Sequence, residues 1–225
     1  MIMKKFLTIA LGILTLGTAS MAAQDDAPAT IQRVSVMYDL NTLSPKYGDN
    51  SYFNGVGAGY TIDFRVSNTL PLYVGTGLNL RAVFDKDKII FSDDYDPVNI
   101  NVKSTLLNLN LPINVSYRVP VADNFYLTPQ VGLDFRVQLF GQSRLDLDGY
   151  FPEIDRTVSE KSKLNLFSKD DLGDEHLRRF QMGWHAGLNF EYCRVNLGLS
   201  YGTDFVKIHK NVGGSNFLVS LGYTF

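Results

Sequence analysis

Apolar and polar residues alternate along most of this chain, and the pattern is clearest at the C-terminus. Between residues 216 and 225 every odd position is apolar or aromatic, and four of the five even positions are polar or small. The apolar set is Phe217, Val219, Leu221, Tyr223 and Phe225. A period of two predicts a strand with one apolar face. The same period recurs over 33–40, 55–66, 70–84, 107–118, 127–139, 180–192 and 194–202.

The joins between these eight predicted strands alternate between short and long. The short joins are 67–69, 119–124 and a tight turn around Cys193, and the long ones are 41–51, 85–102, 141–179 and 206–215. Short joins therefore lie at one end of the sheet together with both termini, and long joins lie at the other. This meander is typical of bacterial outer-membrane barrels, which have short periplasmic turns and long external loops. The predicted fold is all-β, an eight-stranded antiparallel up-and-down transmembrane barrel.

Alternation alone does not tell whether the apolar face points into or out of the barrel, because soluble eight-stranded ligand carriers place their apolar face inside. All eleven lysines lie near the N-terminus, in joins or at the loop-side ends of strands, whereas a water-facing sheet is usually rich in lysine. Eleven of the nineteen glycines lie on the polar face, which suits a crowded lumen. Aromatic residues gather near both ends of the apolar face, as in the girdles of membrane barrels. We therefore expect the apolar face to contact lipid.

The N-terminus has the order of a secretory signal peptide: Lys4 and Lys5, an apolar stretch over 6–17, and small residues up to Ala23. We expect a signal peptide over 1–23, one barrel domain over 24–225, and a location in the outer membrane of a Gram-negative cell. The formal net charge is only −2, so no nucleic-acid partner is expected. The single cysteine excludes a disulfide framework and a cysteine zinc site.

Two segments resemble a known family. The alternating residues from Phe217 to the terminal Phe225 resemble the signal that the outer-membrane barrel assembly machinery reads. The run from Leu107 to Tyr117, with Leu111-Pro112-Ile113 at its centre, resembles the fourth strand of the PorT-like, OmpX/OmpA-like outer-membrane β-barrel domain common in Bacteroidetes. The resemblance covers nearly the whole mature chain and implies the barrel fold, the outer membrane, and the assembly machinery as a partner. Some relatives take part in protein secretion, but no residue here carries that role over.

The polar face carries nearly equal numbers of basic and acidic residues. Its charged residues are Arg33, Arg65, Arg81, Arg118, Arg136, Arg194, Asp39, Asp63, Asp134, Glu191 and Asp204. Buried charges are unfavourable unless they are paired, so this balance predicts a lumen filled by ion pairs and hydrogen bonds. The predicted polar core is Arg33, Asp63, Arg65, Arg81, Asp134, Arg136 and Glu191. The sequence leaves the pairing open, and a gated polar path for small solutes is the alternative.

Catalysis on a barrel rim needs a nucleophile and a base, and the candidate bases are His176, His185 and His209. Lipid A deacylases on this fold would show His-x-Ser, but Gly187 stands two residues after His185 and Asn211 two residues after His209. We expect no catalytic residues, no metal site and no cofactor, and so no enzyme. The rival hypotheses are a lipid-modifying enzyme, a small gated pore and an accessory of protein secretion.

The join over 141–179 has 39 residues, and joins of that length usually have a function or are disordered. Alternation over 144–148 and 163–167 predicts that strands five and six extend beyond the membrane as a protruding hairpin, whose edge could pair with another protein. Lys103 and Lys207 lie near the outer rim, where they either meet lipid phosphates or serve as solubilising charge. We therefore expect a monomer with a structural or surface-interaction role, in contact with outer-membrane lipids and lipopolysaccharide, with a candidate protein partner at this join.

Overall fold

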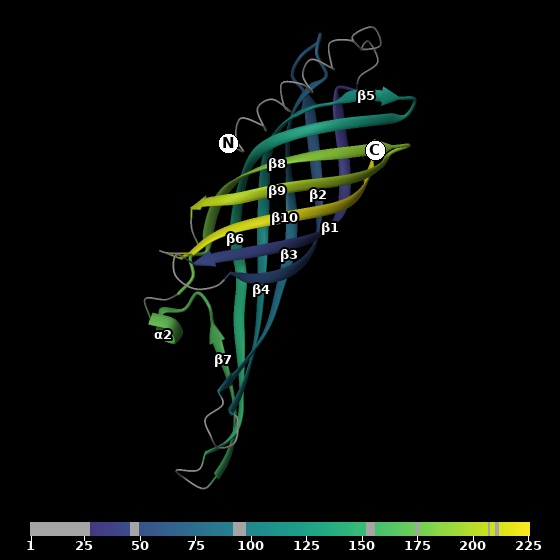
Figure 1. Ribbon diagram of the computed structural model, residues 1–225. Coiled ribbons are helices and arrows are strands. Elements are labelled where there is room, and N and C mark those ends of the chain that lie inside the picture. The colour runs from purple at the N-terminus through teal and green to yellow at the C-terminus, as the bar shows by residue number, and fades with distance from the viewer. Residues whose placement is uncertain are drawn as a thin grey trace, which may run out of the picture.

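Eight strands form a closed antiparallel barrel in the computed structural model (Figure 1), which describes residues 28–45, 50–91, 98–151, 156–173, 176–206, 208–209 and 212–225. The barrel strands are β1 (Thr30–Pro45), β2 (Ser51–Arg65), β3 (Leu72–Phe91), β4 (Val98–Tyr117), β6 (Phe125–Phe151), β8 (Phe180–Tyr192), β9 (Val195–Val206) and β10 (Val212–Thr224). Each pairs with the next along the chain, and β1 pairs with β10 to close the sheet. The predicted eight-stranded, all-β meander is confirmed. The predicted signal peptide, 1–23, lies outside the described residues.

Three smaller elements attach to this barrel. β5 (Val119–Ala122) folds back on the start of β6, at the end of the barrel that holds the C-terminus. β7 (Arg156–Asn165) pairs with the far end of β6, and α2 (Lys169–Leu172) is a single turn between β7 and β8. In the described part of the chain, no helix is long and apolar enough to cross a membrane.

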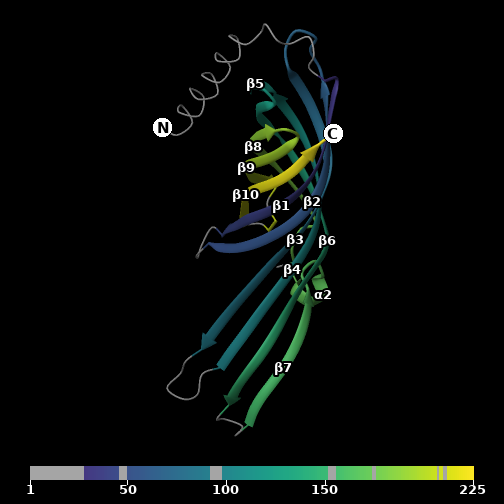
Figure 2. The same ribbon diagram turned by 90° about the vertical axis from the view of Figure 1, so that its right-hand side faces the viewer.

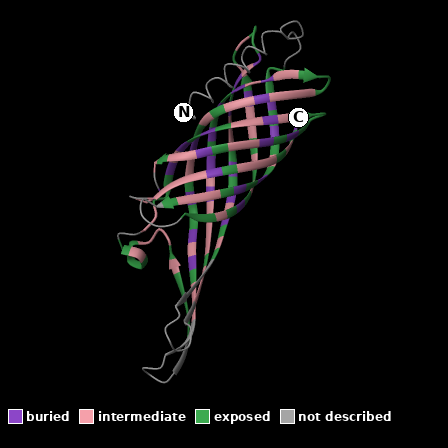
Figure 3. Ribbon diagram, viewed as in Figure 1, coloured by how far each residue is buried: buried purple, intermediate pink, exposed green. Residues whose placement is uncertain are grey.

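The two faces of the barrel sheet differ sharply in polarity. On β4, Asn110 is fully buried in the lumen, whereas its neighbour Leu111 points outward and is 41% exposed. On β1, Asp39 is 1% exposed and Leu40 is 45% exposed. Figure 3 shows the resulting alternation of buried and exposed bands along each strand. The predicted outward apolar face is thus present, and closing the sheet pairs its backbone groups without leaving a free edge.

Three of the barrel strands continue far beyond the barrel. A strand that crosses a membrane needs roughly 10 residues, but β6 has 27 and β3 and β4 have 20 each. Their outer parts, together with β7, form a four-stranded sheet that stands away from the barrel mouth (Figure 2). We call this the protruding sheet; it comprises residues 85–91, 98–106, 141–151 and 156–165.

The protruding sheet confirms one expectation about the joins and corrects two others. Strand five does continue outward, as β6, and pairs with a strand from the second half of the 141–179 join. That partner is not an extension of strand six, however, because β7 ends at Asn165 and α2 separates it from β8. The predicted loop over 85–102 is also wrong: β3 runs to Phe91 and β4 begins at Val98. Polar residues here reflect strands with water on both sides, not a loop.

A bulge marks the point where β6 leaves the barrel. Asn108 of β4 lies opposite Gln138 and Leu107 lies opposite Phe140, so Leu139 has no partner on β4. Leu139 and Phe140 both point outward and are 47% and 48% exposed. Within the barrel the even-numbered residues of β6 face inward. Beyond the bulge the odd-numbered residues do so instead.

Candidate functional site

Ion pairs fill the periplasmic half of the lumen. Arg118 Nη2 lies 2.7 Å from Glu191 Oε1, and Arg33 Nη1 lies 3.5 Å from Asp63 Oδ2. A Cβ added at Gly75 would overlap the Asp63 carboxylate, so the glycine provides the space that this acid occupies. Tyr73 is completely buried beside them, and its hydroxyl donates to the carbonyl of Pro28 at 2.9 Å.

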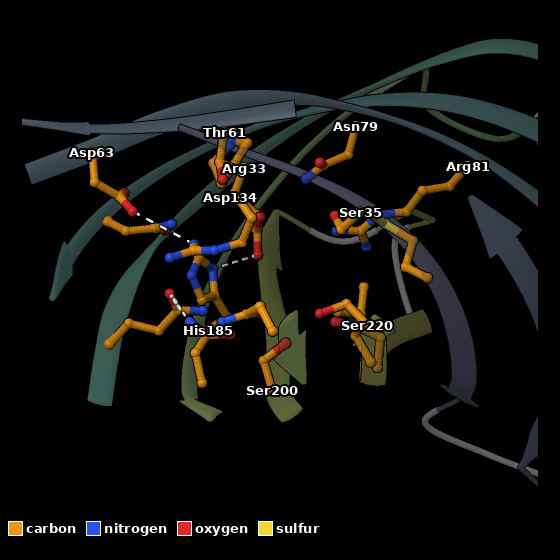
Figure 4. Close-up of a pocket in the computed structure, with 18 residues that line it drawn as sticks. Arg33, Ser35, Thr61, Asp63, Asn79, Arg81, Asp134, His185, Ser200 and Ser220 are labelled. Atoms are coloured by element: carbon orange, nitrogen blue, oxygen red, sulfur yellow. Dashed lines mark hydrogen bonds and ion pairs between the residues drawn. The ribbon is translucent and has the colours of Figure 1, made fainter. Parts of the chain in front are cut away.

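Two acids organise the middle of the lumen. Asp39 Oδ1 lies 3.5 Å from Arg81 Nη1. Asp134 Oδ2 lies 2.7 Å from His185 Nδ1, and Asp134 Oδ1 accepts a hydrogen bond of 2.9 Å from the Asn110 amide. Figure 4 shows Asp134 and His185 in direct contact in the lining of a cavity that Arg33, Asp63 and Arg81 also line.

The external part of the lumen is polar at its base and apolar at its mouth. Arg136 bonds Asp204, and the Gln138 amide donates to Gln181 Oε1 at 3.2 Å. Ile208 is only 6% exposed and lines this region near the external end of the barrel. The two best-defined cavities of the lumen have volumes of about 80 and 60 Å³, which is room for a few water molecules each.

The structure places six of the seven predicted core residues in these pairs. Arg65 lies instead at the periplasmic mouth, where its Nη2 donates to the carbonyl of Asn68 at 3.2 Å. Arg194, expected on the polar face, is exposed in the β8–β9 turn with a φ of 73°. The sequence reasoning passed over Asn110 and His185 as partners of Asp134; their only signal was a polar residue at an inward-facing position.

Four of the five residues of the predicted assembly signal lie on β10, the strand that closes the barrel, and Phe225 follows directly after its end at Thr224. Phe217, Leu221, Tyr223 and Phe225 are between 40% and 66% exposed on the outward face. Tyr223 and Phe225 contact each other edge to face, with ring centroids 5.4 Å apart. Val219 lies between Phe217 and Leu221 in the same outward row, opposite Tyr38 of β1.

The other two histidines lie near the external end. His176 Nδ1 is 2.9 Å from the carbonyl oxygen of Gly173, next to α2. His209 pairs through its backbone with Val212 just before β10. Among the described residues, no group of three or more His, Cys, Asp or Glu side chains is arranged to hold a metal ion.

The protruding sheet has a polar outer face and an inner face on which aliphatic and polar residues are mixed. Its outer face, which continues the outward face of the barrel, carries exposed Lys103 and Arg144, and Lys103 Nζ lies 3.7 Å from Asp146 Oδ2. Its inner face carries half-buried aliphatic residues. They are Ile100, Val102, Leu106, Leu145, Leu147 and Leu164.

The segment around α2 covers the base of β7. The backbone N–H of Asn165 donates to Asp171 Oδ2 at 2.7 Å, and the N–H of Leu177 donates to the carbonyl of Leu166 at 2.8 Å. The Arg179 guanidinium stacks over the Phe167 ring at 4.6 Å. These contacts fix the end of β7 that lies nearest the barrel. Among the described residues, no strand pairs with the edge of β7 that faces away from β6.

The family described as outer membrane protein beta-barrel domain matches residues 11–225. Among solved structures, the attachment invasion locus protein Ail of Yersinia pestis is 12% identical, with a TM-score of 0.41 over 88% of this chain and 100% of that one. Neisserial surface protein A is 11% identical, with a TM-score of 0.41 over 86% and 97% of the two chains. The outer membrane enzyme PagL is 8% identical, with a TM-score of 0.39 over 84% and 98%. Likeness at this level carries nothing about function, and no curated protein sequence matches the chain.

Proposed function

Because the chain belongs to the outer membrane protein β-barrel domain family, and so resides in the bacterial outer membrane, we propose that it is a surface-interaction protein that pairs a partner strand with its protruding sheet. One observation carries the proposal: β7 pairs with β6 along one side, and no strand among the described residues pairs with its other side. Such an edge presents backbone N–H and C=O groups to which an extended peptide can add.

The side chains of β7 restrict which strand can add. Lys161 and Lys163 are exposed on the outer face, so a second copy of β7 would be repelled, as at many protected sheet edges. Leu164 is half-buried on the inner face. A partner strand with acidic residues on its outer face complements the two lysines, and an aliphatic residue on its inner face can lie against Leu164.

A charge-swap experiment tests this proposal. A ten-residue peptide that alternates glutamate with valine should bind the purified protein in phosphatidylcholine nanodiscs and slow amide hydrogen exchange in β7. The variant K161E/K163E should bind it roughly tenfold more weakly, because two cross-strand attractions become repulsions. The same variant should gain affinity for a peptide that alternates lysine with valine.

The matched control is R178E/R194E, which reverses two exposed charges outside β7 and α2. Its affinity for the glutamate peptide should equal that of the wild type. A glutamate peptide with the same composition in shuffled order should bind neither protein. Binding without protection of β7 amides, or equal losses in both double variants, would refute pairing at this edge.

We propose further that the lumen is a side-chain-filled core and not a solute path. The support is its pairing of charges: Arg33 with Asp63, Arg81 with Asp39, and Arg118 with Glu191. Each of these side chains is about 10% exposed or less. The two cavities described among these side chains are small, about 80 and 60 Å³.

We likewise propose that the protein is not an enzyme. His185 is 7% exposed and is engaged by Asp134, so it lacks the access that a rim base needs. The PorT-like subfamily, with its link to secretion, rests on the run from Leu107 to Tyr117 and adds no residue to this proposal. A monomeric state and insertion by the barrel assembly machinery agree with a closed sheet ending in β10.

A further inference from the structure

Four basic residues stand in one row across the protruding sheet. Lys86 of β3 lies directly opposite Lys103 of β4, Lys103 lies opposite Arg144 of β6, and Arg144 lies opposite Lys163 of β7. Directly opposed residues share a face of the sheet, and all four side chains are exposed. With strands about 4.8 Å apart, the row spans roughly 14 Å. We call these four residues the basic row.

This arrangement is unfavourable for the isolated protein. Like charges that face each other directly on adjacent strands repel. Within the described parts of the chain, Lys103 alone of the four has an ion-pair partner, Asp146, and that acid also lies opposite Lys161. The basic row therefore has an excess of positive charge that an anion spanning several strands would neutralise.

The position of the basic row indicates where that anion comes from. The row lies on the outward face, the same face that contacts lipid on the barrel. On β3 the last apolar outward residue, Phe84, is followed at the next outward position by Lys86. On β4, Leu107 is followed by Thr105 and then Lys103, and on β6, Phe140 is followed by Gln142 and then Arg144. A lipid lying against these apolar residues has its headgroup at the row.

We propose that the basic row binds the phosphate groups of an anionic glycolipid in the outer leaflet, whose acyl chains lie against Phe84, Leu107 and Phe140. The sheet thereby holds four cations in fixed register at one edge of the lipid-facing band. The basic row shares Lys163 with the strand addition proposed at β7, and its other three cations lie on β3, β4 and β6, so the two proposals can be tested separately.

Lipid A binding to purified protein tests the proposal. The protein in non-ionic detergent is titrated with bisphosphorylated lipid A, and the bound fraction is measured by native mass spectrometry. The variant K86Q/K103Q/R144Q leaves β7 unchanged. Each charge near an anionic lipid surface is worth roughly a fivefold change in affinity, so the triple variant should bind about 100-fold more weakly. The control K169Q/R178Q/R194Q removes three exposed charges elsewhere and should bind like the wild type.

Two further arms identify the ligand chemistry. Dephosphorylated lipid A, which keeps its acyl chains, should bind wild type and triple variant equally weakly. Inorganic polyphosphate, a soluble polyanion, should bind the wild type more weakly than lipid A does. Heat-modifiable migration in gels verifies that every variant is folded. Unchanged binding by the triple variant, equal losses in both triple variants, or a preference for polyphosphate would overturn the proposal.

Discussion

The same strands carry opposite patterns inside and outside the membrane. Within the barrel, β4 points Asn108 and Asn110 into the lumen and Leu111 outward. Beyond the barrel, β4 points the half-buried Leu106 inward and the exposed Lys103 outward. The backbone and the pairing are continuous, so the medium on each face explains the reversal: lipid requires an apolar outer face, and water favours a polar one.

Two strands achieve this reversal by different means. On β4 the apolar series changes parity in the sequence, with Leu106 and Leu107 adjacent. On β6 the large apolar residues keep odd numbers on both sides of the bulge, from Val131 to Leu139 and again at Leu145 and Leu147, with Gly141 and Ser143 between. The bulge at Leu139 turns the odd positions from the outer to the inner face. Polarity and backbone geometry are therefore interchangeable ways to match a sheet to its surroundings.

The largest effect that separates the two regions is expected from ion pairs. Replacing Arg81 by methionine leaves Asp39, 1% exposed, without its cation, and should lower the free energy of unfolding by about 3–5 kcal/mol. Replacing Lys103 by methionine breaks the pair with Asp146, whose side chains are 55% and 33% exposed, and should cost less than about 1 kcal/mol. Urea unfolding in phosphatidylcholine vesicles, followed by the fluorescence of Trp184, the single tryptophan, measures both.

The double variant D39L/R81M serves as the control for the lumen pair. Removing both charges leaves no unpaired ion, so it should be more stable than R81M alone. If R81M and K103M had equal effects, or if D39L/R81M were the least stable of the three, the lumen would not be the tightly paired core described above.

Much of the barrel can be predicted from the sequence because a membrane sheet needs strict alternation. The series from Phe180 to Tyr192 coincides with β8, and the series over 216–225 lies in β10 except for Phe225, although β10 begins four residues earlier, at Val212. The outer parts of β3 and β4 could not be predicted in this way. Both faces of a protruding strand meet water, so polar residues such as Asp85 and Lys86 occur in strand positions and resemble a loop.

The composition of the lumen could be predicted from the sequence, but its pairing could not. Asp63 and Arg65 lie two apart on one strand and face the same way, yet Asp63 pairs with Arg33 of β1 and Arg65 bonds the turn after β2. Arg136 bonds Asp204, which is 68 residues away along the chain. Such partners depend on the stagger between strands around the closed barrel, which alternation along one strand does not encode.

A smaller effect is expected from charge placed on the outer face of β4. Leu111 lies in the middle of the lipid-facing band, and replacing it by lysine should cost about 2–4 kcal/mol of unfolding free energy. Thr105 lies on the same face just beyond that band, and the same substitution there should cost about 0–1 kcal/mol. The vesicle unfolding assay compares them directly. Equal losses at both positions would place the edge of the lipid band farther out than Leu107.

The smallest effect is expected from deleting Leu139, although a deletion in a membrane strand is normally severe. Leu139 is the extra residue of the bulge, so without it Gln138 still faces the lumen, Phe140 still faces outward and Gly141 still faces inward. The variant should fold into lipid vesicles with a loss within about 1 kcal/mol.

Deleting Phe135, four residues earlier on β6, is the matched comparison, because it removes the same number of residues from a regular part of the ladder. Residues 136–139 would then change faces, and Arg136 and Gln138 would point into lipid. No heat-modifiable folded band is expected for this variant. The two deletions differ in whether the deleted residue has a partner on β4: Phe135 has one and Leu139 has none. If the Leu139 deletion failed to fold, the bulge would be required for the barrel to form. If that variant folded with an intact protruding sheet, seen as protected amides in β7, the role of the bulge would be only to change which residues of β6 face inward where the strand leaves the lipid.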